Sequence, residues 1–332
     1  MTDSSILKIG FIGAGDVSPL HAEAVGRCKG ARLRGLWNRT QSNANSKAEL
    51  FGCRTYSTPE ELCADPEIDA VFILTNLETH HKYSLLALQH GKHVLVEKPV
   101  AATIDEIKDI RNLAQEKQVV CVPGHNYVYE ESLMRTRRLL LDGDLGRLIS
   151  VYVLYNIHHP EEVARRYPGV IRQILTHHSY ILLFLAGAPR RVSALKATLH
   201  YEELENEDIA LVNIQTANGA LAHFCASFAA DDHAADPWTV QIRVIGTKGS
   251  TRYSYRDWVE LKPAVVHSQT YSAYLGSICN EVEYFVSRCI GNGEPPLSTL
   301  EDAILAQQLI EAIEESVEQG KTVECCSQEG LK

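Results

Sequence analysis

A short apolar run, residues 93–96, ends abruptly in Glu97, Lys98 and Pro99. The run indicates a buried strand, and charges at the end of a core strand are costly unless water, a partner or a ligand receives them. In open α/β sheets, ligands bind at the carboxyl ends of the strands. Lys98 is therefore the first candidate for a catalytic residue, because its amine can hold a substrate oxygen and exchange a proton. The alternative is a structural ion pair with Glu97, which otherwise tunes the amine or caps local backbone.

The start of the chain carries a second chemical signal. An apolar strand over residues 6–12 runs directly into Gly13, Ala14 and Gly15, and a helix is expected over residues 20–28. Strand, glycine turn and helix form the dinucleotide-binding signature, in which the glycines allow a tight turn and let a pyrophosphate approach the helix N-terminus. Ser18 replaces the third glycine and is still small. We therefore expect a dinucleotide cofactor here, with a purely structural turn as the alternative.

The second strand, residues 32–37, ends in Asn38, Arg39 and Thr40. Binders of NAD usually place an acidic residue at this point, where it accepts the adenosine ribose hydroxyls. Here an amide and a guanidinium take that place, and a guanidinium suits a 2′-phosphate. The sequence therefore favours NADP(H) over NAD(H), with a solvated Arg39 and use of NAD as the alternative.

The elements that must position these residues change character after residue 123. Strands over residues 69–74, 93–96 and 119–122 alternate with helices over residues 79–90 and 104–116, which predicts a parallel, doubly wound sheet. Beyond Pro123 and Gly124, strands predominate over residues 148–155, 191–198, 209–216, 220–228, 239–245 and 250–255. Helices are expected over residues 130–141, 170–185, 281–288 and 300–319. We expect an α/β protein with a Rossmann domain (residues 1–123) and an α+β substrate-binding and oligomerisation domain (residues 124–332) whose last helix packs back on the first domain.

Bulk properties exclude several classes of protein. The chain has 332 residues and a net charge of −10 with no basic block, which argues against nucleic acid or an anionic membrane surface as partner. No apolar run reaches the roughly 18 residues that a membrane span needs, and residues 1–4 contain no basic segment. The nine cysteines are scattered without a Cys-x-x-Cys pair, so we expect reduced thiols in a cytoplasmic protein.

The chain resembles the Gfo/Idh/MocA family of NAD(P)-dependent oxidoreductases. The matching residues are Gly13-Ala14-Gly15 with His21, Thr75 with His80, Gly91-Lys92-His93-Val94 leading into Glu97-Lys98-Pro99, Gly124-His125-Asn126-Tyr127, Asp142-Gly143-Asp144-Leu145-Gly146 and Leu300-Glu301-Asp302-Ala303. The resemblance implies an open, mostly antiparallel sheet in the second domain, one face of which usually builds an oligomer interface, so a homodimer or homotetramer is expected. It also implies a sugar, cyclitol or polyol substrate, and a proline after the lysine that is often cis.

The same resemblance points to the second half of the active site. The family usually has an aspartate, three residues and a histidine on one helix; His177 falls on the histidine and Gln173 on the aspartate, while Tyr180 replaces a further aspartate. The i, i+4 spacing would put Gln173 and His177 on one helical face. Gln173 cannot titrate, so it can only orient a hydroxyl. The proton-transfer groups are then Lys98 and His177, with Tyr180 as a further candidate, and we expect nicotinamide between the domains.

One alternative role for His177, one further substrate contact and the cofactor-binding residues complete the expected site. His177 could instead be a helix histidine satisfied by backbone, as we expect His178 to be. Tyr127 is a plausible substrate contact in the loop after Gly124. The expected cofactor-binding residues are Gly13, Ala14, Gly15, Asp16, Val17, Asn38, Arg39, Thr40, Thr75, Asn76, His80, Glu97, Lys98 and Asn126.

No metal site is expected, although imidazoles and carboxylates cluster at His158, His159, Glu161 and Glu162. Neighbouring residues there point apart, so a loop over the active site is the better interpretation. Three arginines (Arg165, Arg166 and Arg172) could bind an anionic substrate or could lie on a solvated or interface face, and the segment Asp231-Asp232-His233 could form a pocket wall.

The expected function is hydride transfer between nicotinamide and a carbinol or ketone of a sugar, cyclitol or polyol. The alternatives are a non-catalytic, cofactor-binding sensor of the same fold and an enzyme that uses transient oxidation for elimination or group transfer. Because Gln173 replaces the usual acid, we expect Lys98 to carry more of the proton transfer than it does in related enzymes.

Overall fold

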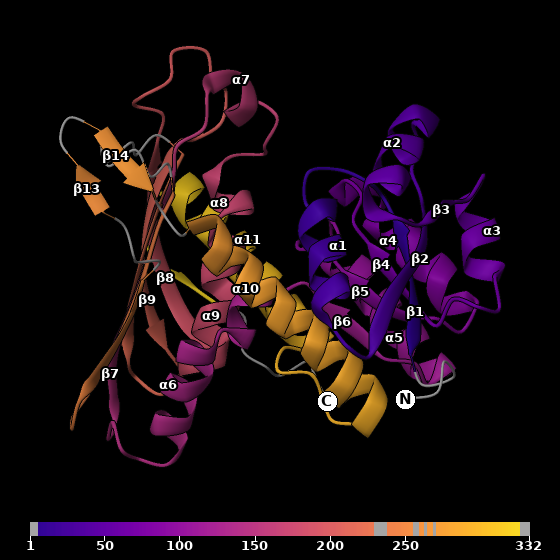
Figure 1. The fold of residues 1–332 in the computed structure, drawn as a ribbon. Helices are drawn as coiled ribbons and strands as arrows, with labels where there is room; N and C mark the ends of the chain where they lie inside the picture. The colour runs from indigo at the N-terminus through magenta and orange to yellow at the C-terminus, as the bar shows by residue number, and fades with distance from the viewer. Residues whose placement is uncertain (1–5, 229–237, 255–258, 262–263, 268–269, 326–332) are drawn as a thin grey trace. The chain divides into compact units, whose positions relative to one another are not determined.

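The computed structural model describes residues 6–228, 238–254, 259–261, 264–267 and 270–325. The chain forms two compact units (Figure 1). The first comprises Met1–Tyr129 and Leu275–Ile304, and the second comprises Glu130–Tyr274 and Leu305–Lys332. A segment near the carboxyl end of the chain therefore folds with the amino-terminal unit. The functional division at residue 123 stays a prediction.

The first unit is built on a six-stranded parallel sheet in the order β3-β2-β1-β4-β5-β6. This order confirms the doubly wound parallel sheet predicted from the alternation of strands and helices. Its strands are β1 (Leu7–Ile12), β2 (Ala31–Trp37), β3 (Arg54–Thr55), β4 (Ala70–Ile73), β5 (His93–Val96) and β6 (Cys121–Pro123). Its helices include α1 (Ser18–Arg27), α2 (Gln41–Phe51), α3 (Pro59–Ala64), α4 (Leu77–Gln89), α5 (Ile104–Lys117) and a 3₁₀ helix, η2 (Asn126–Tyr129).

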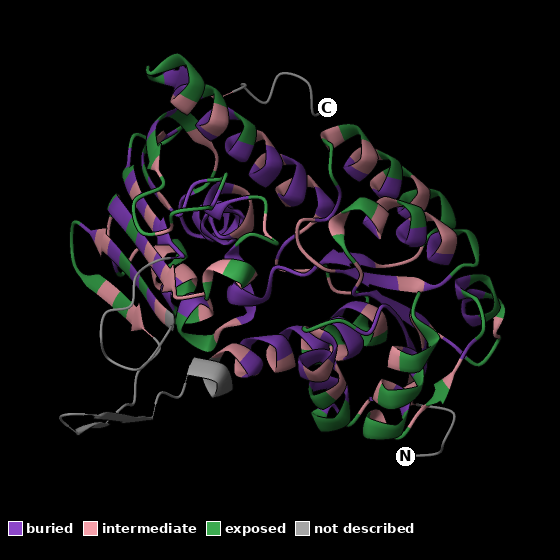
Figure 2. Ribbon diagram, turned by 90° about the horizontal axis from the view of Figure 1, so that it is seen from above, coloured by how far each residue is buried: buried purple, intermediate pink, exposed green. Residues whose placement is uncertain are grey.

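Apolar patterning explains why the central strands of this sheet are buried. All four residues of β4 are buried, as are the last three of β5 (Figure 2). Helix α5 buries Ile107, Ile110 and Ala114, which recur at helical spacing on one face. Thr103 caps this helix as predicted, and the Glu106 side chain accepts from the Thr103 backbone N–H in a capping box. The carboxyl end of β5, where Glu97 follows, is thus anchored by core packing.

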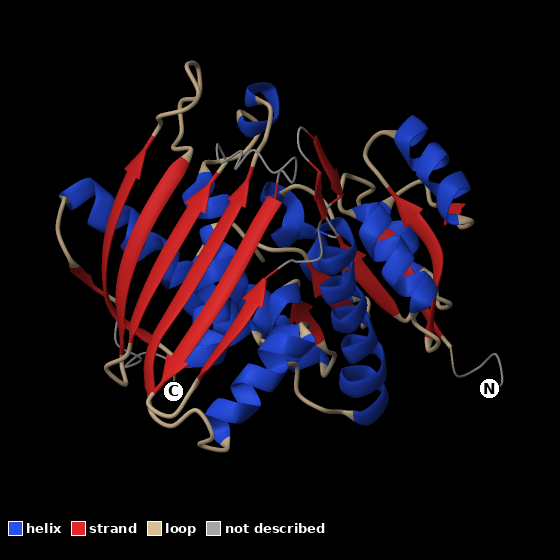
Figure 3. Cartoon of the chain, turned by 60° about the vertical axis from the view of Figure 1, so that its left-hand side comes forward, coloured by secondary structure: helices blue, strands red, loops and turns tan. Residues whose placement is uncertain are grey.

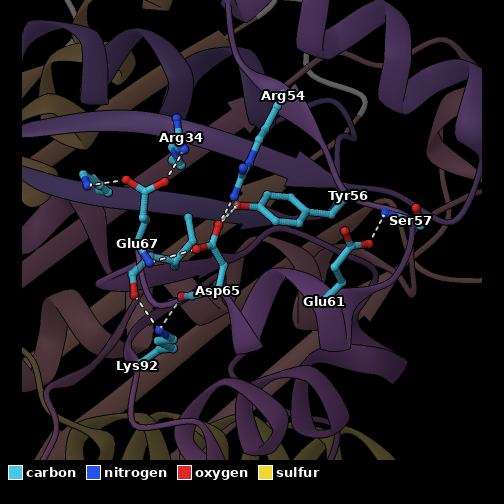
Figure 4. Close-up of polar contacts among 10 residues, drawn as sticks. Arg34, Arg54, Tyr56, Ser57, Glu61, Asp65, Glu67 and Lys92 are labelled. Carbon is cyan, nitrogen blue, oxygen red and sulfur yellow. Dashed lines mark hydrogen bonds and ion pairs between the residues drawn. The ribbon is translucent and has the colours of Figure 1, made fainter.

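A polar network in the same unit contains a buried lysine, Lys92, with a purely structural role. Lys92 lies between α4 and β5 and donates to the backbone carbonyls of Asp65 at 2.8 Å and Ile68 at 2.6 Å (Figure 4). In the same network, Glu67 forms an ion pair with Arg34. Burial lowers the pKa of Lys92, while Asp69 works in the opposite direction. Lys92 therefore joins chain segments and provides a structural counterpart to Lys98.

The second unit contains a seven-stranded sheet in the order β12-β11-β7-β10-β9-β8-β15. Only β7 and β10 pair in parallel, so the predicted open, mostly antiparallel sheet is confirmed. Its strands are β7 (Leu148–Ile157), β8 (Pro189–Ala197), β9 (Ile209–Thr216), β10 (Leu221–Ser227), β11 (Trp238–Gly246), β12 (Ser250–Ser254) and β15 (Val323–Glu324). A separate two-stranded sheet pairs β13 (Val259–Leu261) with β14 (Ala264–His267).

The helices of this half of the chain include α6 (Glu131–Leu141), α7 (Glu161–Ala164), α8 (Val170–Gln173), α9 (Leu175–Ala186), α10 (Thr270–Glu283), the π-helical turn η3 (Tyr284–Ile290) and α11 (Leu300–Gln319). Figure 3 shows that one face of the large sheet is uncovered by helices. The side chains of β9 alternate between buried and exposed, which matches a sheet with one packed and one open face.

One local prediction was wrong in a way that matters for the site. The single helix expected over residues 170–185 is broken at Ile174 into α8 and α9. A tertiary contact holds the start of α8, where Glu207 accepts from the backbone N–H of Ile171 at 3.0 Å. A Cβ on Gly169, which has φ +96°, would lie 2.4 Å from a Glu207 carboxylate oxygen, so this close approach requires glycine. Gln173 and His177 consequently do not share one continuous helix.

Two further differences concern the boundaries of elements. The helix predicted over residues 281–288 begins much earlier, at Thr270, and its last residues form the π-helical turn η3. Tyr127, predicted in a loop, lies in the 3₁₀ helix η2 and is fully buried. The start of α10 up to Tyr274 belongs to the second unit, and the rest of the helix belongs to the first.

Candidate active site

The glycine turn after β1 has the form that a dinucleotide needs. Gly13 has φ +106°, and a Cβ there would lie 2.5 Å from the carbonyl oxygen of Leu74. Only glycine fits that backbone approach. A Cβ on Gly15 would meet nothing within 4 Å, and no side chain caps the N-terminus of α1. The open space above Gly15 fits a cofactor pyrophosphate at this turn.

Asn38 holds this turn against the end of β2. Its Oδ1 accepts from the backbone N–H of Ala14 at 3.1 Å, and its Nδ2 donates to the carbonyl of Thr40 at 3.2 Å. Arg39 and Thr40 are exposed beside it. The amide of Asn38 is therefore a positioning group for the turn, while the guanidinium of Arg39 is presented at the surface.

His80 joins the carboxyl ends of two neighbouring strands. The side chain is buried; its Nε2 lies 2.9 Å from the carbonyl oxygen of Thr75, and its Nδ1 lies 2.8 Å from that of Pro99. A carbonyl oxygen can only accept, so both hydrogen bonds form together only in the doubly protonated ring. Thr75 also accepts from the Thr79 hydroxyl at 2.8 Å. These contacts tie the loop after β4 to the segment after β5.

Glu97 is a buried carboxylate that is fully engaged. Its Oε1 lies 2.7 Å from Nε2 of His21, and its Oε2 accepts from the backbone N–H of Lys98 at 3.0 Å. Burial on its own would raise the pKa of Glu97, but the His21 hydrogen bond and charge, the Lys98 charge and the Lys98 N–H together lower it. Glu97 is therefore ionised at neutral pH, as a charge-assisted acceptor.

Lys98 follows this anion at the carboxyl end of β5. Burial lowers its pKa to about 8, although the charge of Glu97 works in the opposite direction. The Lys98–Pro99 peptide bond is cis. An amine with this pKa is present in both protonation states near neutral pH, so it can donate or accept a proton.

Two more buried groups, His125 and Glu281, lie close enough to interact electrostatically with this pair. Burial lowers the pKa of His125 to about 3; to a smaller extent, the charge of Glu97 raises this pKa and that of Lys98 lowers it. Nδ1 of His125 is hydrogen-bonded to the Ser298 hydroxyl at 2.6 Å. Burial and the charge of Glu97 raise the pKa of Glu281 well above its ordinary value, partly offset by the backbone N–H of His125. Glu281 is therefore a neutral acid beside an ionised one.

Sequence reasoning assigned no role to His21, His125 or Glu281. His21 and His125 are both members of the family motifs quoted above, so their positions were a usable signal. Glu281 gave none, because it comes from α10, far along the chain. Asn126, which was expected at the cofactor, donates its Nδ2 to the Ser277 hydroxyl at 2.6 Å and so ties η2 to α10.

In the second unit, the predicted residues His177 and Tyr180 come together. Nδ1 of His177 lies 2.6 Å from the Tyr180 hydroxyl, and both side chains are buried. The ring of Tyr155, from β7, lies 5.6 Å from the His177 ring between centroids. Gln173 lies on the far side of the break at Ile174, at the end of α8. The neighbourhood that the structure describes for His177 is thus aromatic.

The expectation that His178 is satisfied by backbone was wrong. Neither of its ring nitrogens has a hydrogen-bond partner in the described part of the chain, and burial lowers its pKa to about 3. Its ring packs against Phe224 at 5.2 Å between centroids. His178 is a neutral core residue that is held by packing.

Of the remaining candidates from the sequence, two arginines form ion pairs, and the others have no assigned role. Arg172 makes a two-pronged ion pair with Glu314 at 2.6 and 2.7 Å, and Arg165 pairs with Glu203 at 2.7 Å. The ring of His158 lies 6.0 Å from that of His200. Among the residues that the structure describes, no group of three His, Cys, Asp or Glu side chains is arranged to hold a metal. The segment Asp231-Asp232-His233 lies outside the described residues.

Together, a tight glycine turn between β1 and α1 and a six-stranded parallel sheet indicate that the first unit is a dinucleotide-binding domain. Residues 7–125 match the family profile described as "Oxidoreductase family, NAD-binding Rossmann fold", and residues 133–252 match the "GFO/IDH/MocA C-terminal domain". The chain therefore belongs to the Gfo/Idh/MocA family of NAD(P)-dependent oxidoreductases, as its sequence motifs indicated. None of its described helices combines the length and apolar character needed to cross a bilayer.

Three individual proteins illustrate the range of relatives. Glucose-6-phosphate 3-dehydrogenase of Bacillus subtilis is 32% identical over 146 residues, which cover 44% of this chain and 41% of that protein. Inositol 2-dehydrogenase of Rhizobium meliloti is 24% identical over 331 residues, which cover 96% and 98%. The structure of scyllo-inositol dehydrogenase from Lactobacillus casei, with bound NAD(H) and scyllo-inositol, has a TM-score of 0.85 at 20% identity, covering 97% of this chain and 100% of that one. The last comparison bears on the fold alone.

Proposed function

We propose that the chain catalyses reversible hydride transfer between NAD(P) and a secondary alcohol of a sugar, cyclitol or polyol. The observation that carries this proposal is Lys98, an amine with a pKa of about 8 beside the ionised Glu97, at the carboxyl end of a parallel strand. Membership of an oxidoreductase family and relatives named as inositol and glucose-6-phosphate dehydrogenases support the substrate class.

The bound cofactor supplies the hydride acceptor, or the hydride donor in reduction. As the alcohol carbon loses hydride, its hydroxyl proton must pass to a base, and we propose that neutral Lys98 takes it. In the opposite direction, protonated Lys98 gives a proton to the carbonyl oxygen as it becomes a hydroxyl. We propose His177 as the second proton-handling group, and Gln173, Tyr127 and Tyr180 as the remaining substrate-site candidates. Cofactor contacts are proposed for Gly13, Ala14, Gly15, Asp16, Val17, Thr75, Asn76 and the other residues predicted above.

The test is turnover with a panel of sugars, inositols and their keto forms, followed through the nicotinamide absorbance. We expect activity with at least one member of the panel and its loss in Lys98→Met with cofactor affinity retained. Tight cofactor binding without turnover on a broad panel would instead favour the non-catalytic sensor, for which Gln173 in place of an acid is the supporting feature.

We further propose a preference for NADP(H) over NAD(H). The exposed Arg39 directly after Asn38 supports it, because a guanidinium can contact a 2′-phosphate. Arg39→Ser should weaken NADPH binding by about 10- to 100-fold, the usual value of a charge-assisted contact, and leave NADH binding unchanged. Arg27→Ser, which removes an exposed arginine paired with Glu23, is the matched control. Equal effects of Arg39→Ser on both cofactors would reject the preference.

A homodimer or homotetramer through the open sheet face is also proposed, in a cytoplasmic setting. Large apolar side chains lie exposed on this face of β7, β8, β9 and β10: Tyr152 (45% exposed), Leu195 (74%), Leu211 (39%) and Leu221 (57%). Tyr152 and Leu221 line a hollow of about 560 Å³, together with polar residues that include Arg191 and His223. Exposed apolar patches of this kind mark protein interfaces. Light scattering should show an oligomer that Leu211→Lys dissociates.

A further inference from the structure

We propose that His21 is a positioning residue for Lys98, on which it acts through Glu97. This inference deepens the proposed function and rests on it only for the part that Lys98 plays in proton transfer. His21 belongs to α1, the helix that follows the glycine turn, and its side chain is fully buried. The polar atoms of its ring therefore need partners within the first unit.

The contact between His21 and Glu97 is direct. Nε2 of His21 lies 2.7 Å from Oε1 of Glu97, a distance typical of a hydrogen bond to a charged group. An ionised carboxylate can only accept, so Nε2 carries the proton and donates it. Nδ1 of the same ring is buried and has no hydrogen-bond partner in the part of the chain that the structure describes. The contact with Glu97 is therefore the hydrogen bond that a change of His21 would test.

This hydrogen bond connects α1 with the carboxyl end of β5. In the sheet order, β4 separates β1, which leads into α1, from β5, which leads into Glu97. The ring of Phe72, on β4, packs edge to face against the His21 ring, with centroids 5.7 Å apart and planes at 80°. The backbone N–H of Glu97 donates to the carbonyl of Ile73, the last residue of β4, at 3.0 Å. Core packing and backbone pairing therefore fix the two ends of the hydrogen bond.

Glu97 extends the connection to Lys98. Its Oε2 accepts from the backbone N–H of Lys98 at 3.0 Å, while its Oε1 is held by His21. Burial on its own raises the pKa of Glu97, and the largest opposing influence is the His21 hydrogen bond. Burial lowers the pKa of Lys98, and the charge of Glu97 raises it. Without the His21 donor, burial would favour protonated Glu97, and the Lys98 amine would lose the anion that helps to hold its proton.

Other titratable groups of the first unit also act on this pair. His125, from the segment after β6, and Glu281, from α10, both interact electrostatically with Glu97. Burial lowers the pKa of His125 to about 3, and burial with the charge of Glu97 raises that of Glu281 well above its ordinary value, so both side chains are neutral near pH 7. Neither group therefore supplies a cation that would replace the His21 donor.

The experiment is an NMR titration of protein labelled with carbon-13 at the lysine ε-carbon, in which the Lys98 signal is identified by its loss in Lys98→Met. Two amide variants of His21 form a matched pair. The amide of His21→Gln lies as far along the side chain as Nε2 and can still donate to Glu97, whereas that of His21→Asn extends only as far as Nδ1. His21→Asn should move the Lys98 titration down by about one pH unit, and His21→Gln should leave it near pH 8.

A double-mutant cycle tests whether the effect passes through Glu97. In a Glu97→Gln background the carboxylate is absent, so adding His21→Asn should move the Lys98 titration no further. This background also leaves no unpaired carboxylate, which keeps the test available if His21→Asn alone does not fold. A further shift in the double variant would overturn the proposal. So would equal shifts in His21→Asn and His21→Gln, or a Lys98 titration that stays in place or moves up in His21→Asn.

Activity provides a second, separable measurement. With an active substrate, the pH below which alcohol oxidation falls should move down in His21→Asn together with the Lys98 titration, which lost packing alone would not do. If the titration responds as expected but the unmodified protein turns over no sugar or polyol, the inference about His21 stands and the proposed function fails. If turnover is found but the Lys98 signal does not respond to His21→Asn, the proposed function stands and the inference about His21 fails.

Discussion

The polar cluster around Lys98 in the first unit and the cluster around His177 in the second are built from opposite kinds of group. Around Lys98, the Glu97 carboxylate is ionised and that of Glu281 is neutral, and the two Glu97 oxygens bind His21 and the backbone N–H of Lys98. Around His177, the groups that the structure describes are aromatic, and the hydrogen bond to Nδ1 comes from a phenol. The first cluster is therefore held by interacting charges, whereas the contacts described for the second are a hydrogen bond and aromatic packing.

The surroundings of Lys98 indicate that this residue should set the pH dependence of activity. Buried charges need partners, because removing one from water is costly. Glu97 has two partners and stays ionised, and its charge limits how far burial depresses the pKa of Lys98. Nδ1 of His177 is hydrogen-bonded to the Tyr180 hydroxyl. We expect Lys98 to dominate the pH profile of the enzyme.

The strongest test of the comparison removes Lys98 itself. Lys98→Met should lower kcat/KM by about 10²- to 10⁴-fold, the usual contribution of a general acid or base. Lys92→Met is the matched control, because this buried lysine binds only the carbonyls of Asp65 and Ile68 among the described residues. It should lower the free energy of unfolding and leave turnover per folded molecule near normal. Similar losses of turnover in both variants would show that Lys98 is structural.

The pH dependence gives the next effect. Because the Lys98 pKa is lowered to about 8, alcohol oxidation should fall about tenfold per pH unit below 8 and ketone reduction should fall above it. The same group affects stability: its folded pKa lies below the ordinary 10.5, so the unfolded chain binds the proton more tightly. The free energy of unfolding should therefore rise as pH increases from about 8 to 10.5. Persistence of both dependences in Lys98→Met would assign them to another group.

The two carboxyl groups near Lys98 should respond differently to neutralisation. Glu97→Gln should lower the free energy of unfolding by about 1–3 kcal/mol, because the His21 contact loses its charge, and should move the activity profile to lower pH. Glu281→Gln should leave the profile in place, because Glu281 is already neutral. Urea unfolding and kcat/KM against pH measure both effects. A shift in Glu281→Gln as large as that in Glu97→Gln would mean that Glu281 is ionised.

The smallest expected effect compares two buried histidines. Both have a pKa lowered to about 3 by burial, but His125 is hydrogen-bonded to Ser298, whereas His178 has no partner among the described residues. His178→Leu should raise the free energy of unfolding by about 1 kcal/mol, because unpaired buried nitrogens cost free energy. His125→Leu should lower it instead. Urea unfolding that shows a loss of stability in His178→Leu would point to an unrecognised partner.

Much of the architecture could be predicted from the sequence, because local patterns encode it. The alternation of apolar strands and helices up to residue 122 predicted the parallel sheet, and the glycine turn predicted the dinucleotide site. Thr103 predicted a helix start that proved to be a full capping box. Lys98 could be singled out because charges directly after an apolar strand are unusual. Each of these signals lies within a few residues of the feature it predicts.

Only the tertiary structure decided the contacts between segments that lie far apart in the chain. Glu207 holds the start of α8, although 36 residues separate it from Ile171, whose backbone N–H donates to it. Glu281 lies beside Glu97, although it comes from α10. Such contacts set pKa values and tautomers, since those depend on burial and on neighbours in space. The sequence by itself indicated which groups are candidates for the chemistry, and the fold decided which of them are charged.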